Sequence, residues 1–147
     1  MITTEQNPEV FRACFIEAFV DRQSPFYTER ILKPAPCSEG VCYYGYLWEC
    51  MKSWELVSLT FAAHYIGTQT GVIHAMCDLH PPSYFPRNRR WSRNTVFTFP
   101  ACDLEKMIEM LPEDCYFFDD SFSWAIALTH EESKPGRRLV ALAKSDL

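Results

Sequence analysis

Apolar residues near the start of the chain recur with the spacing of one face of an α-helix. These positions are Phe11, Cys14, Phe15, Ala18 and Phe19. They follow an Asn-Pro pair at residues 7–8, where asparagine can cap the first free N–H groups and proline fits the first helical position. The pattern predicts a helix over residues 8–19 that packs through its phenylalanines.

Helical spacing recurs twice before residue 67. Residues 43–52 carry apolar side chains at this spacing and predict a second helix. Residues 54–66 fit a helix and a strand equally well, and we expect a helix because two adjacent alanines disfavour a strand centre. Residues 21–40 are broken by proline, serine and glycine, which predicts a long connection with one turn near residues 28–32.

The remainder of the chain is dominated by strand-like runs of apolar, β-branched and aromatic residues. The runs that predict strands are residues 71–80, 95–99, 115–118, 123–129 and 137–144. One clean helical stripe lies between them, over residues 103–111, and Pro112 ends it. A Lys-Pro-Gly sequence at residues 134–136 predicts the turn between the last two strands.

The order of these elements predicts the fold class. Three helices, two strands, one helix and three strands indicate an α+β (mixed α/β) domain with a sheet of about five strands. The last three strands are joined by short turns and should form an antiparallel meander in an otherwise mixed sheet, with helices packed on it. The chain has 147 residues, which is the usual size of one domain, so we expect a single domain over residues 1–147.

Composition indicates a folded protein of the cytoplasm. Aromatic residues make up 15% of the chain and charged residues 22%, enough apolar surface to offset the loss of chain entropy. The seven cysteines include no C-x-x-C pair and follow no secretory leader, so we expect reduced, buried thiols. No window has the roughly 18 apolar residues of a membrane span, so we expect no membrane association. We also expect no cofactor.

Charge is distributed unevenly along the chain. The formal net charge is −5, and residues 103–132 hold nine acidic residues against Lys106 alone. Nucleic acid is therefore an unexpected ligand, because phosphate binding needs the opposite sign. An acidic surface suits a basic protein partner better.

Six acidic residues flank the predicted strands of the C-terminal meander and are candidates for a partner-binding surface. They are Glu113, Asp114, Asp119, Asp120, Glu131 and Glu132. If the strands are antiparallel, the 119–120 turn and residues 131–132 lie at opposite ends of one strand, about 25 Å apart at strand rise, and do not form one patch. The simpler interpretation is that these are turn and strand-end residues that stay in water.

Two other kinds of site can be constructed from the sequence. A small metal-dependent hydrolase could use Asp78, His80, His130 and Glu131. The four histidines of the chain match no ligand spacing such as H-E-x-x-H, however, and Asp78 and His80 also suit a turn. No G-x-S-x-G sequence or phosphate-binding glycine loop occurs either. We therefore expect no enzymatic activity.

A compact basic cluster is the third alternative. Residues 87–93 contain Arg87, Arg89, Arg90 and Arg93 beside Trp91, and such a combination can bind RNA through phosphate contacts and base stacking. More often such a run is a solvated loop whose arginines pair with nearby carboxylates. This chain has a surplus of carboxylates, so we give RNA binding the lower place.

The run Y-F-F-D-D-S-F-S-W-A-I-A-L-T-H-E-E, over residues 116–132, carries a resemblance. It is similar to the C-terminal signature of small uncharacterised bacterial cytosolic proteins, some of which resemble immunity proteins of polymorphic or contact-dependent toxin systems. The similarity covers residues 111–140. It implies a non-enzymatic inhibitor that binds one cognate toxin domain, often a basic nuclease. In that setting Trp124 is a sheet core residue, and no catalytic residue carries over.

Overall fold

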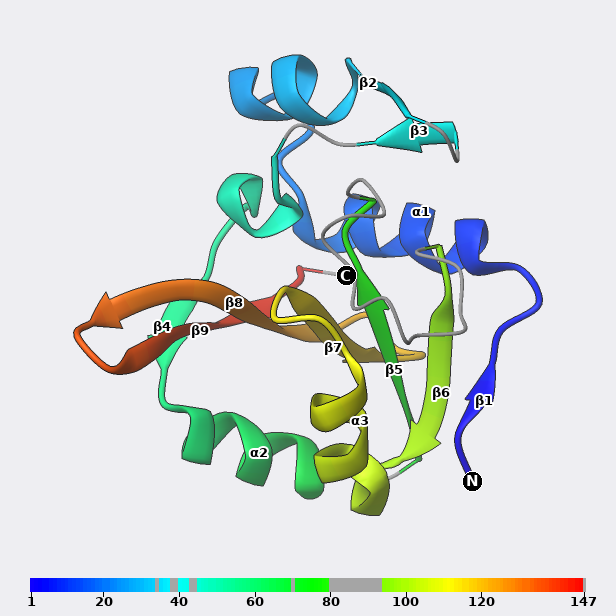
Figure 1. The fold of residues 1–147 in the computed structure, drawn as a ribbon, viewed down its shortest axis with the longest axis vertical. Coiled ribbons are helices and arrows are strands. Elements are labelled where there is room, and N and C mark those ends of the chain that lie inside the picture. Colours follow the sequence, from blue (N-terminus) through cyan, green and yellow to red (C-terminus); the bar gives the residue numbers. More distant parts are fainter. Residues whose placement is uncertain (34, 38–39, 43–44, 70, 80–93, 147) are drawn as a thin grey trace.

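The computed structural model describes residues 1–33, 35–37, 40–42, 45–69, 71–79 and 94–146. Its main feature is a seven-stranded sheet with the strand order β1-β6-β5-β7-β8-β9-β4 (Figure 1). The strands are β1 (Thr3–Thr4), β4 (Glu55–Val57), β5 (Val72–Cys77), β6 (Val96–Pro100), β7 (Cys115–Asp119), β8 (Trp124–Lys134) and β9 (Arg137–Lys144).

The α+β class and the C-terminal meander are confirmed, but the sheet has seven strands instead of about five, and every pairing in it is antiparallel. The two edge strands, β1 and β4, are two and three residues long. A segment of that length is too short to display a period-two pattern, so the alternation of polar and apolar residues does not reveal it.

The first helix, α1 (Pro8–Phe19), is confirmed with its predicted bounds and with proline in its first turn. Phe15 and Phe19 are buried on one face of the sheet. Arg12 lies on the same helix and is also buried, at 6% exposure. Its guanidinium donates from Nη2 to the Cys77 carbonyl at 2.8 Å and from Nε to the Asn94 side chain at 3.1 Å, and these bonds tie α1 to the end of β5.

The connection after α1 holds more regular structure than the sequence predicts. A π-helical turn, η1 (Tyr27–Ile31), stands where one turn is expected. It is followed by a small hairpin of β2 (Ala35–Cys37) and β3 (Gly40–Cys42). The predicted helix over residues 43–52 is reduced to a 3-10 turn, η2 (Leu47–Cys50), while residues 43–44 lie outside the described part of the chain.

Long-range backbone pairing explains why η2 is so short. The N–H of Asp21 donates to the Cys50 carbonyl at 2.8 Å, and the N–H of Lys52 donates to the Phe19 carbonyl at 2.8 Å. Val20 and Met51 form an antiparallel bridge at the same place. These bonds hold Met51 extended beside the end of α1, so the helical spacing cannot continue.

Residues 54–66 contain both structures that the sequence allows. Strand β4 pairs with β9, and α2 (Leu59–Gly67) follows after one residue. Ser58 is the N-cap, and its Oγ accepts the Phe61 N–H at 3.0 Å. The prediction of one helix from residue 54 was therefore wrong at its start, because pairing with β9 holds residues 55–57 extended.

Helices cover both faces of the sheet (Figure 1). Helix α1, η1 and η2 pack on one face, against side chains such as Met76, Tyr116 and Phe118. Helix α2 packs on the other face with η4 (Ala101–Asp103) and α3 (Leu104–Met110), against side chains such as Phe99, Phe117 and Ile126. Alternation along β7 sends Tyr116 and Phe118 to the first core and Phe117 to the second.

Strand β8 runs five residues further than predicted and is irregular there. Leu128 pairs with Val140, but the next pairing joins Glu132 to Arg138. Residues 129–131 of β8 therefore stand opposite residue 139 alone, which makes a β-bulge. A bulge locally changes the direction in which side chains point. The turn beyond it contains Gly136 at φ 74°, a conformation that favours glycine.

The prediction that the cysteine thiols are buried is correct only in part. Cys50, Cys77 and Cys115 are buried, whereas Cys102 is exposed and Cys14 is half-buried, and all five are free. Burial raises the pKa of Cys50 and of Cys115 to about 12, so these two groups stay protonated. None of the described helices combines the length and the apolar character needed to cross a bilayer.

Candidate functional site

The six candidate acidic residues fall into two groups at opposite ends of β7 and β8. Cys115 pairs with Leu128, and Phe118 pairs with Ala125. Residues 113–114 therefore lie beside residue 130, while residues 119–120 lie beside the start of β8. We call residues 119–124 the turn end. The hairpin end comprises residues 113–114, residues 129–132 and Arg138.

At the turn end, the Asp119 carboxylate is engaged within the protein. Its Oδ2 accepts the indole Nε1–H of Trp124 at 2.8 Å. Its Oδ1 accepts the Ser121 N–H at 3.0 Å and also accepts the Ser121 hydroxyl. Trp124 is only 3% exposed, so Asp119 supplies the acceptor that a buried indole requires. Asp119 thus closes the turn and anchors a core side chain.

Asp120 is also bonded internally, although its side chain is exposed. Its Oδ1 lies 2.8 Å from Nε2 of His74, a residue that is only 2% exposed. Nδ1 of the same ring lies 3.0 Å from the Thr98 hydroxyl, which in turn donates to the Glu5 carboxylate. A chain of polar contacts therefore joins the turn, β5, β6 and the N-terminal segment.

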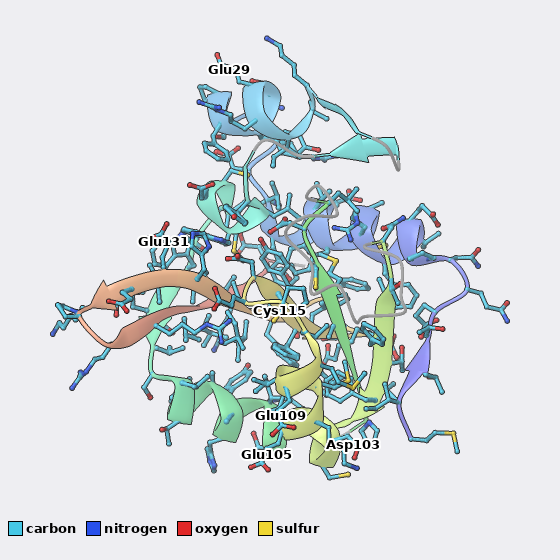
Figure 2. All side chains as sticks on the ribbon, viewed as in Figure 1. Glu29, Asp103, Glu105, Glu109, Cys115 and Glu131 are labelled. Atoms are coloured by element: carbon cyan, nitrogen blue, oxygen red, sulfur yellow. The ribbon has the colours of Figure 1, made fainter. Side chains whose placement is uncertain are left out.

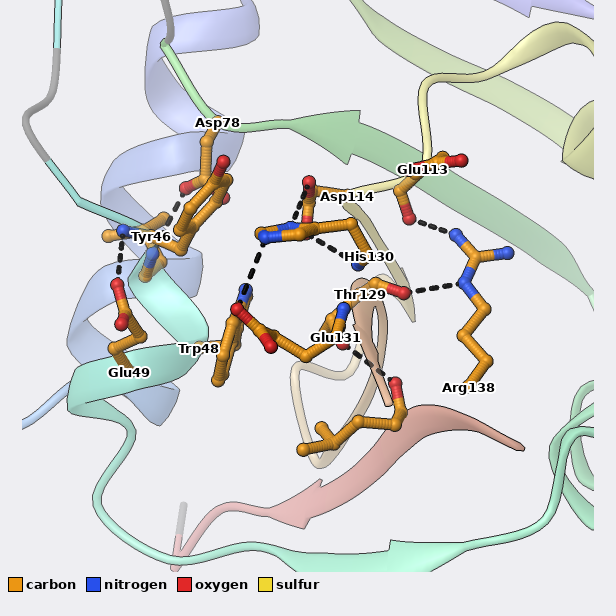
Figure 3. A network of polar contacts seen from close by, with 12 residues as sticks. Tyr46, Trp48, Glu49, Asp78, Glu113, Asp114, Thr129, His130, Glu131 and Arg138 are labelled. Atoms are coloured by element: carbon orange, nitrogen blue, oxygen red, sulfur yellow. Dashed lines mark hydrogen bonds and ion pairs between the residues drawn. The ribbon is translucent and has the colours of Figure 1, made fainter. Parts of the chain in front are cut away.

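At the hairpin end, the bulge brings His130 against Asp114 (Figure 3). The Asp114 carboxylate accepts the backbone N–H of His130 at 3.0 Å and lies 2.9 Å from its Nδ1. Nε2 of the same ring lies 3.2 Å from the Glu131 carboxylate. Hydrogen bonding to Asp114 raises the pKa of His130, since it favours the protonated ring.

Tyr46, just before η2, packs against the His130 ring, and Trp48 stacks on Tyr46. The Tyr46 ring centroid is 5.1 Å from that of His130 and 5.9 Å from that of Trp48, with which it stacks. Glu49 is exposed on the same turn, and its carboxylate accepts the Tyr46 N–H at 3.0 Å. The Trp48 indole N–H is buried and has no hydrogen-bond partner in the described part of the chain.

A buried carboxylate fixes η2 to the sheet. Asp78 is 1% exposed, and it accepts the Tyr116 hydroxyl at 2.6 Å and the Leu47 N–H at 3.1 Å. The Tyr116 oxygen in turn accepts the Trp48 N–H at 3.0 Å. Burial raises the pKa of Asp78 to about 7, although both hydrogen bonds act in the opposite direction. Asp78 therefore positions Tyr46 and Trp48 through the backbone that carries them.

Arg138 joins the hairpin to the start of β7. Its Nε donates to the Thr129 carbonyl at 2.6 Å, and its Nη2 donates to the Glu113 carbonyl (Figure 3). A shallow pocket of about 260 Å³ opens here. Its lining includes Glu113, Thr129, His130, Glu131, Glu132 and Arg138. The Arg138 guanidinium serves backbone carbonyls, so the carboxylates around it remain exposed.

The residues of the alternative metal site are in different situations. Both oxygens of Asp78 accept hydrogen bonds in the core, whereas His130 and Glu131 lie at the surface. His80 lies outside the described residues, as do the four arginines of residues 87–93. In the described part of the chain, no group of three or more His, Cys, Asp or Glu side chains could hold a metal ion.

Sequence reasoning located the acidic residues but not their neighbours. The link between Asp114 and His130 depends on the β8 bulge, which has no sequence signature here. Tyr46 and Trp48 were assigned to a predicted helix and contribute to the site from a 3-10 turn. Tyrosine and tryptophan are enriched at protein interfaces, so the presence of Tyr46 and Trp48 close together was the available indication of a binding surface.

Comparison of the chain with protein-family models, with curated proteins and with solved structures finds no match.

Proposed function

We propose that this chain is a non-enzymatic protein-binding inhibitor, an immunity protein that neutralises a cognate toxin domain, and that it binds this partner through the hairpin end. The expected partner is a basic domain, such as a nuclease. Its basic surface would meet the carboxylates of Glu113, Glu131 and Glu132, with Glu49 beside them. The resemblance of residues 116–132 to such proteins and the charge of the surface support the same proposal.

The observation that carries the proposal is the arrangement of exposed carboxylates at the hairpin end. Glu113, Glu131 and Glu132 come from two separate segments and are all exposed. The Arg138 guanidinium between them donates to carbonyl oxygens instead. The internal contacts of Glu131 and Glu132, with the His130 ring and with the Gly136 N–H, are solvent-exposed, so a basic partner can reach these carboxylates. Charge complementarity of this kind increases association rate and specificity.

The aromatic side chains add contact area beside the charges. Tyr46 and Trp48 are half-buried, and their stacking restricts the conformations that they must lose on binding. Tyrosine and tryptophan are frequent hot spots of protein interfaces. The indole N–H of Trp48 is buried, so its contribution to an interface would be the exposed part of its ring. This part of the surface therefore adds aromatic contact area beside the carboxylates.

Charge reversal at the hairpin end tests the proposal. The partner to use is the toxin domain encoded in a neighbouring reading frame, purified and titrated by calorimetry. The double variant E131K/E132K should weaken binding about 100-fold, since each close charge pair across an interface couples by roughly 1.5 kcal/mol or more. The wild-type affinity should also fall as salt is raised.

A matched control lies on the other face of the sheet. Glu105 is exposed on α3, well away from Glu131 (Figure 2). E105K and the single reversal E131K change the net charge by the same amount. Because Glu105 lies away from the hairpin end, E105K should alter the affinity less than threefold. The proposal fails if no neighbouring gene product binds, or if E105K and E131K weaken binding equally.

A further inference from the structure

A second concave surface lies beside the β8–β9 hairpin and has the opposite charge. It is a groove of about 750 Å³ between the hairpin and the junction of β4 with α2. Its apolar lining comes from Leu56, Val57 and Leu59, and its basic lining comes from Lys134, Arg137 and Arg138. This groove is distinct from the shallow acidic pocket of the hairpin end, although Arg138 and Gly136 border both.

The groove continues the path of β4 along an open edge of β9. Strand β9 has eight residues, but β4 pairs only with Val140, Ala141 and Leu142. The chain leaves this path at Ser58, which caps α2. Arg137 and Arg138 pair with β8 on one side of β9, and on the other side no described strand pairs with residues 137–139. An extended segment placed in the groove would lie where a longer β4 would run.

Exposed apolar side chains concentrate at this place. Leu56 is 54% exposed and Leu59 is 44% exposed, and both line the groove. Trp54, just before β4, and Phe61, on α2, are also exposed. Half of the eight large apolar side chains that are exposed among the described residues therefore lie within residues 54–61. Clustered exposure of this kind marks interaction sites, whereas isolated exposed apolar residues do not.

The charge at the rim selects the occupant. Lys134 and Arg137 are exposed and form no ion pair with any carboxylate in the described residues. The chain as a whole carries a net charge of −5, so a positive rim is a local exception. An extended segment with acidic side chains at the rim and apolar side chains on the floor would complement both features.

We propose that the groove binds an extended, acidic and apolar segment of a partner polypeptide, which adds as a strand to the open edge of β9 at residues 137–139. Backbone hydrogen bonds would supply affinity, and contacts with Leu59 and Arg137 would supply selectivity, as in other cases of strand addition. The inference does not depend on the proposed function, because it concerns another surface and a ligand of opposite charge.

A second copy of this chain is a poorer occupant. Antiparallel pairing of two β9 edges about a two-fold axis brings each residue opposite a symmetry-related one. Arg138 would then face Arg138, with Lys134 and Arg137 of both copies nearby. Like charges directly opposite each other destabilise paired strands.

A library of random dodecapeptides, displayed on phage and selected against the immobilised full chain, tests the proposal. Enriched peptides should combine aspartate or glutamate with β-branched or aromatic residues. Synthetic versions should bind the double variant K134E/R137E at least tenfold more weakly than wild type, with less than a twofold change for K144E. Lys144 is an exposed cation at the other end of β9 and serves as the control.

Hydrogen exchange supplies a readout that separates strand addition from simple charge attraction. The bound peptide should slow amide exchange at residues 137–139. The proposal is overturned if enriched peptides lack acidic residues, if K134E/R137E binds as tightly as wild type, or if protection appears only elsewhere. Sedimentation of the free chain as a dimer that K134E/R137E disrupts would assign the groove to a second copy and would also overturn it.

Discussion

The two ends of the β7–β8 pair are both acidic but have different structures. The turn end has one pair of adjacent acidic residues and the hairpin end has two pairs, and at each end a histidine lies within contact distance of a carboxylate. At the turn end, His74 is buried under Asp120, and Asp119 holds the Trp124 indole. At the hairpin end, the side chain of His130 is 35% exposed and that of Glu131 is 54% exposed. The sign of the charges is therefore a poor guide to which end can receive a partner.

The difference comes from the hydrogen-bond donors that surround each end. The turn end lies over the sheet, where a buried indole, a buried imidazole and the turn backbone all offer donors to carboxylates. The hairpin end extends beyond the paired part of β4, where Asp114 accepts the His130 N–H and Glu131 contacts only the exposed Nε2 edge of the same ring. A carboxylate with buried donors stabilises the fold, and one whose contacts are solvent-exposed stays available for a ligand.

The largest expected effect concerns the buried carboxylate that holds η2 to the sheet. The pKa of Asp78 is about 7 in the folded protein, against an ordinary value of 3.8. The folded state thus keeps a proton that the unfolded chain has lost, and stability falls as pH rises from about 4 to about 7. This difference between the folded and the ordinary pKa of Asp78 corresponds to roughly 4 kcal/mol of unfolding free energy. Urea unfolding of wild type and D78N at several pH values measures this change. If the unfolding free energy of the two proteins depended on pH in the same way, the prediction would be contradicted.

The next largest effect concerns the hydroxyl of Tyr116, which donates a hydrogen bond to Asp78. Y116F removes this hydroxyl, which also accepts a hydrogen bond from the backbone N–H of Trp48. The Trp48 backbone N–H would lose its partner and the buried Asp78 would keep only the Leu47 N–H, so the variant should lose about 3 kcal/mol of unfolding free energy. Y65F is the control, because no hydrogen bond of the Tyr65 hydroxyl occurs among the described residues, and it should change stability by less than about 0.5 kcal/mol. Similar losses for both variants would refute the link.

Removing one carboxylate from each end directly tests the contrast between them. D119A leaves the Trp124 indole N–H buried without an acceptor and should cost about 2 kcal/mol in urea unfolding. E131A removes a solvent-exposed contact and should cost less than about 0.5 kcal/mol. Partner affinity should respond in the opposite way, with E131A the more damaging. If E131A proved the more destabilising variant, the assignment of the hairpin end as the free end would be wrong.

The smallest expected effect is electrostatic and local to His130. Its pKa is raised in the folded protein, chiefly by the hydrogen bond to Asp114. The stability that this contact adds is fully present below the ordinary histidine value of 6.5 and disappears as pH rises through the folded value. D114N should lower the pKa of His130 in an NMR titration. An unchanged titration in D114N would show that Glu131, not Asp114, controls the ring.

Parts of the fold with a regular repeat could be predicted from sequence. The stripe of α1 and the runs that form β5, β7 and β9 have enough residues for a period of 3.6 or 2 to be recognised. The edge strands β1 and β4 are too short for that, and η2 has helical spacing that the bonds to Asp21 and Phe19 interrupt. Where long-range pairing competes with local spacing, the pairing decides the local structure.

For the site, the sequence by itself determined where the carboxylates are and that the two acidic groups lie at opposite ends of the β7–β8 pairing. Strand geometry alone implies this, since residues 119–120 and 131–132 flank the predicted strand over residues 123–129. Only the tertiary structure decided which carboxylates have internal donors, because those donors are the side chains of Trp124 and His74 and the backbone around the bulge. A hydrogen bond depends on distances of a few tenths of an ångström between groups from different elements. Packing sets such distances, and no local pattern of residues contains them.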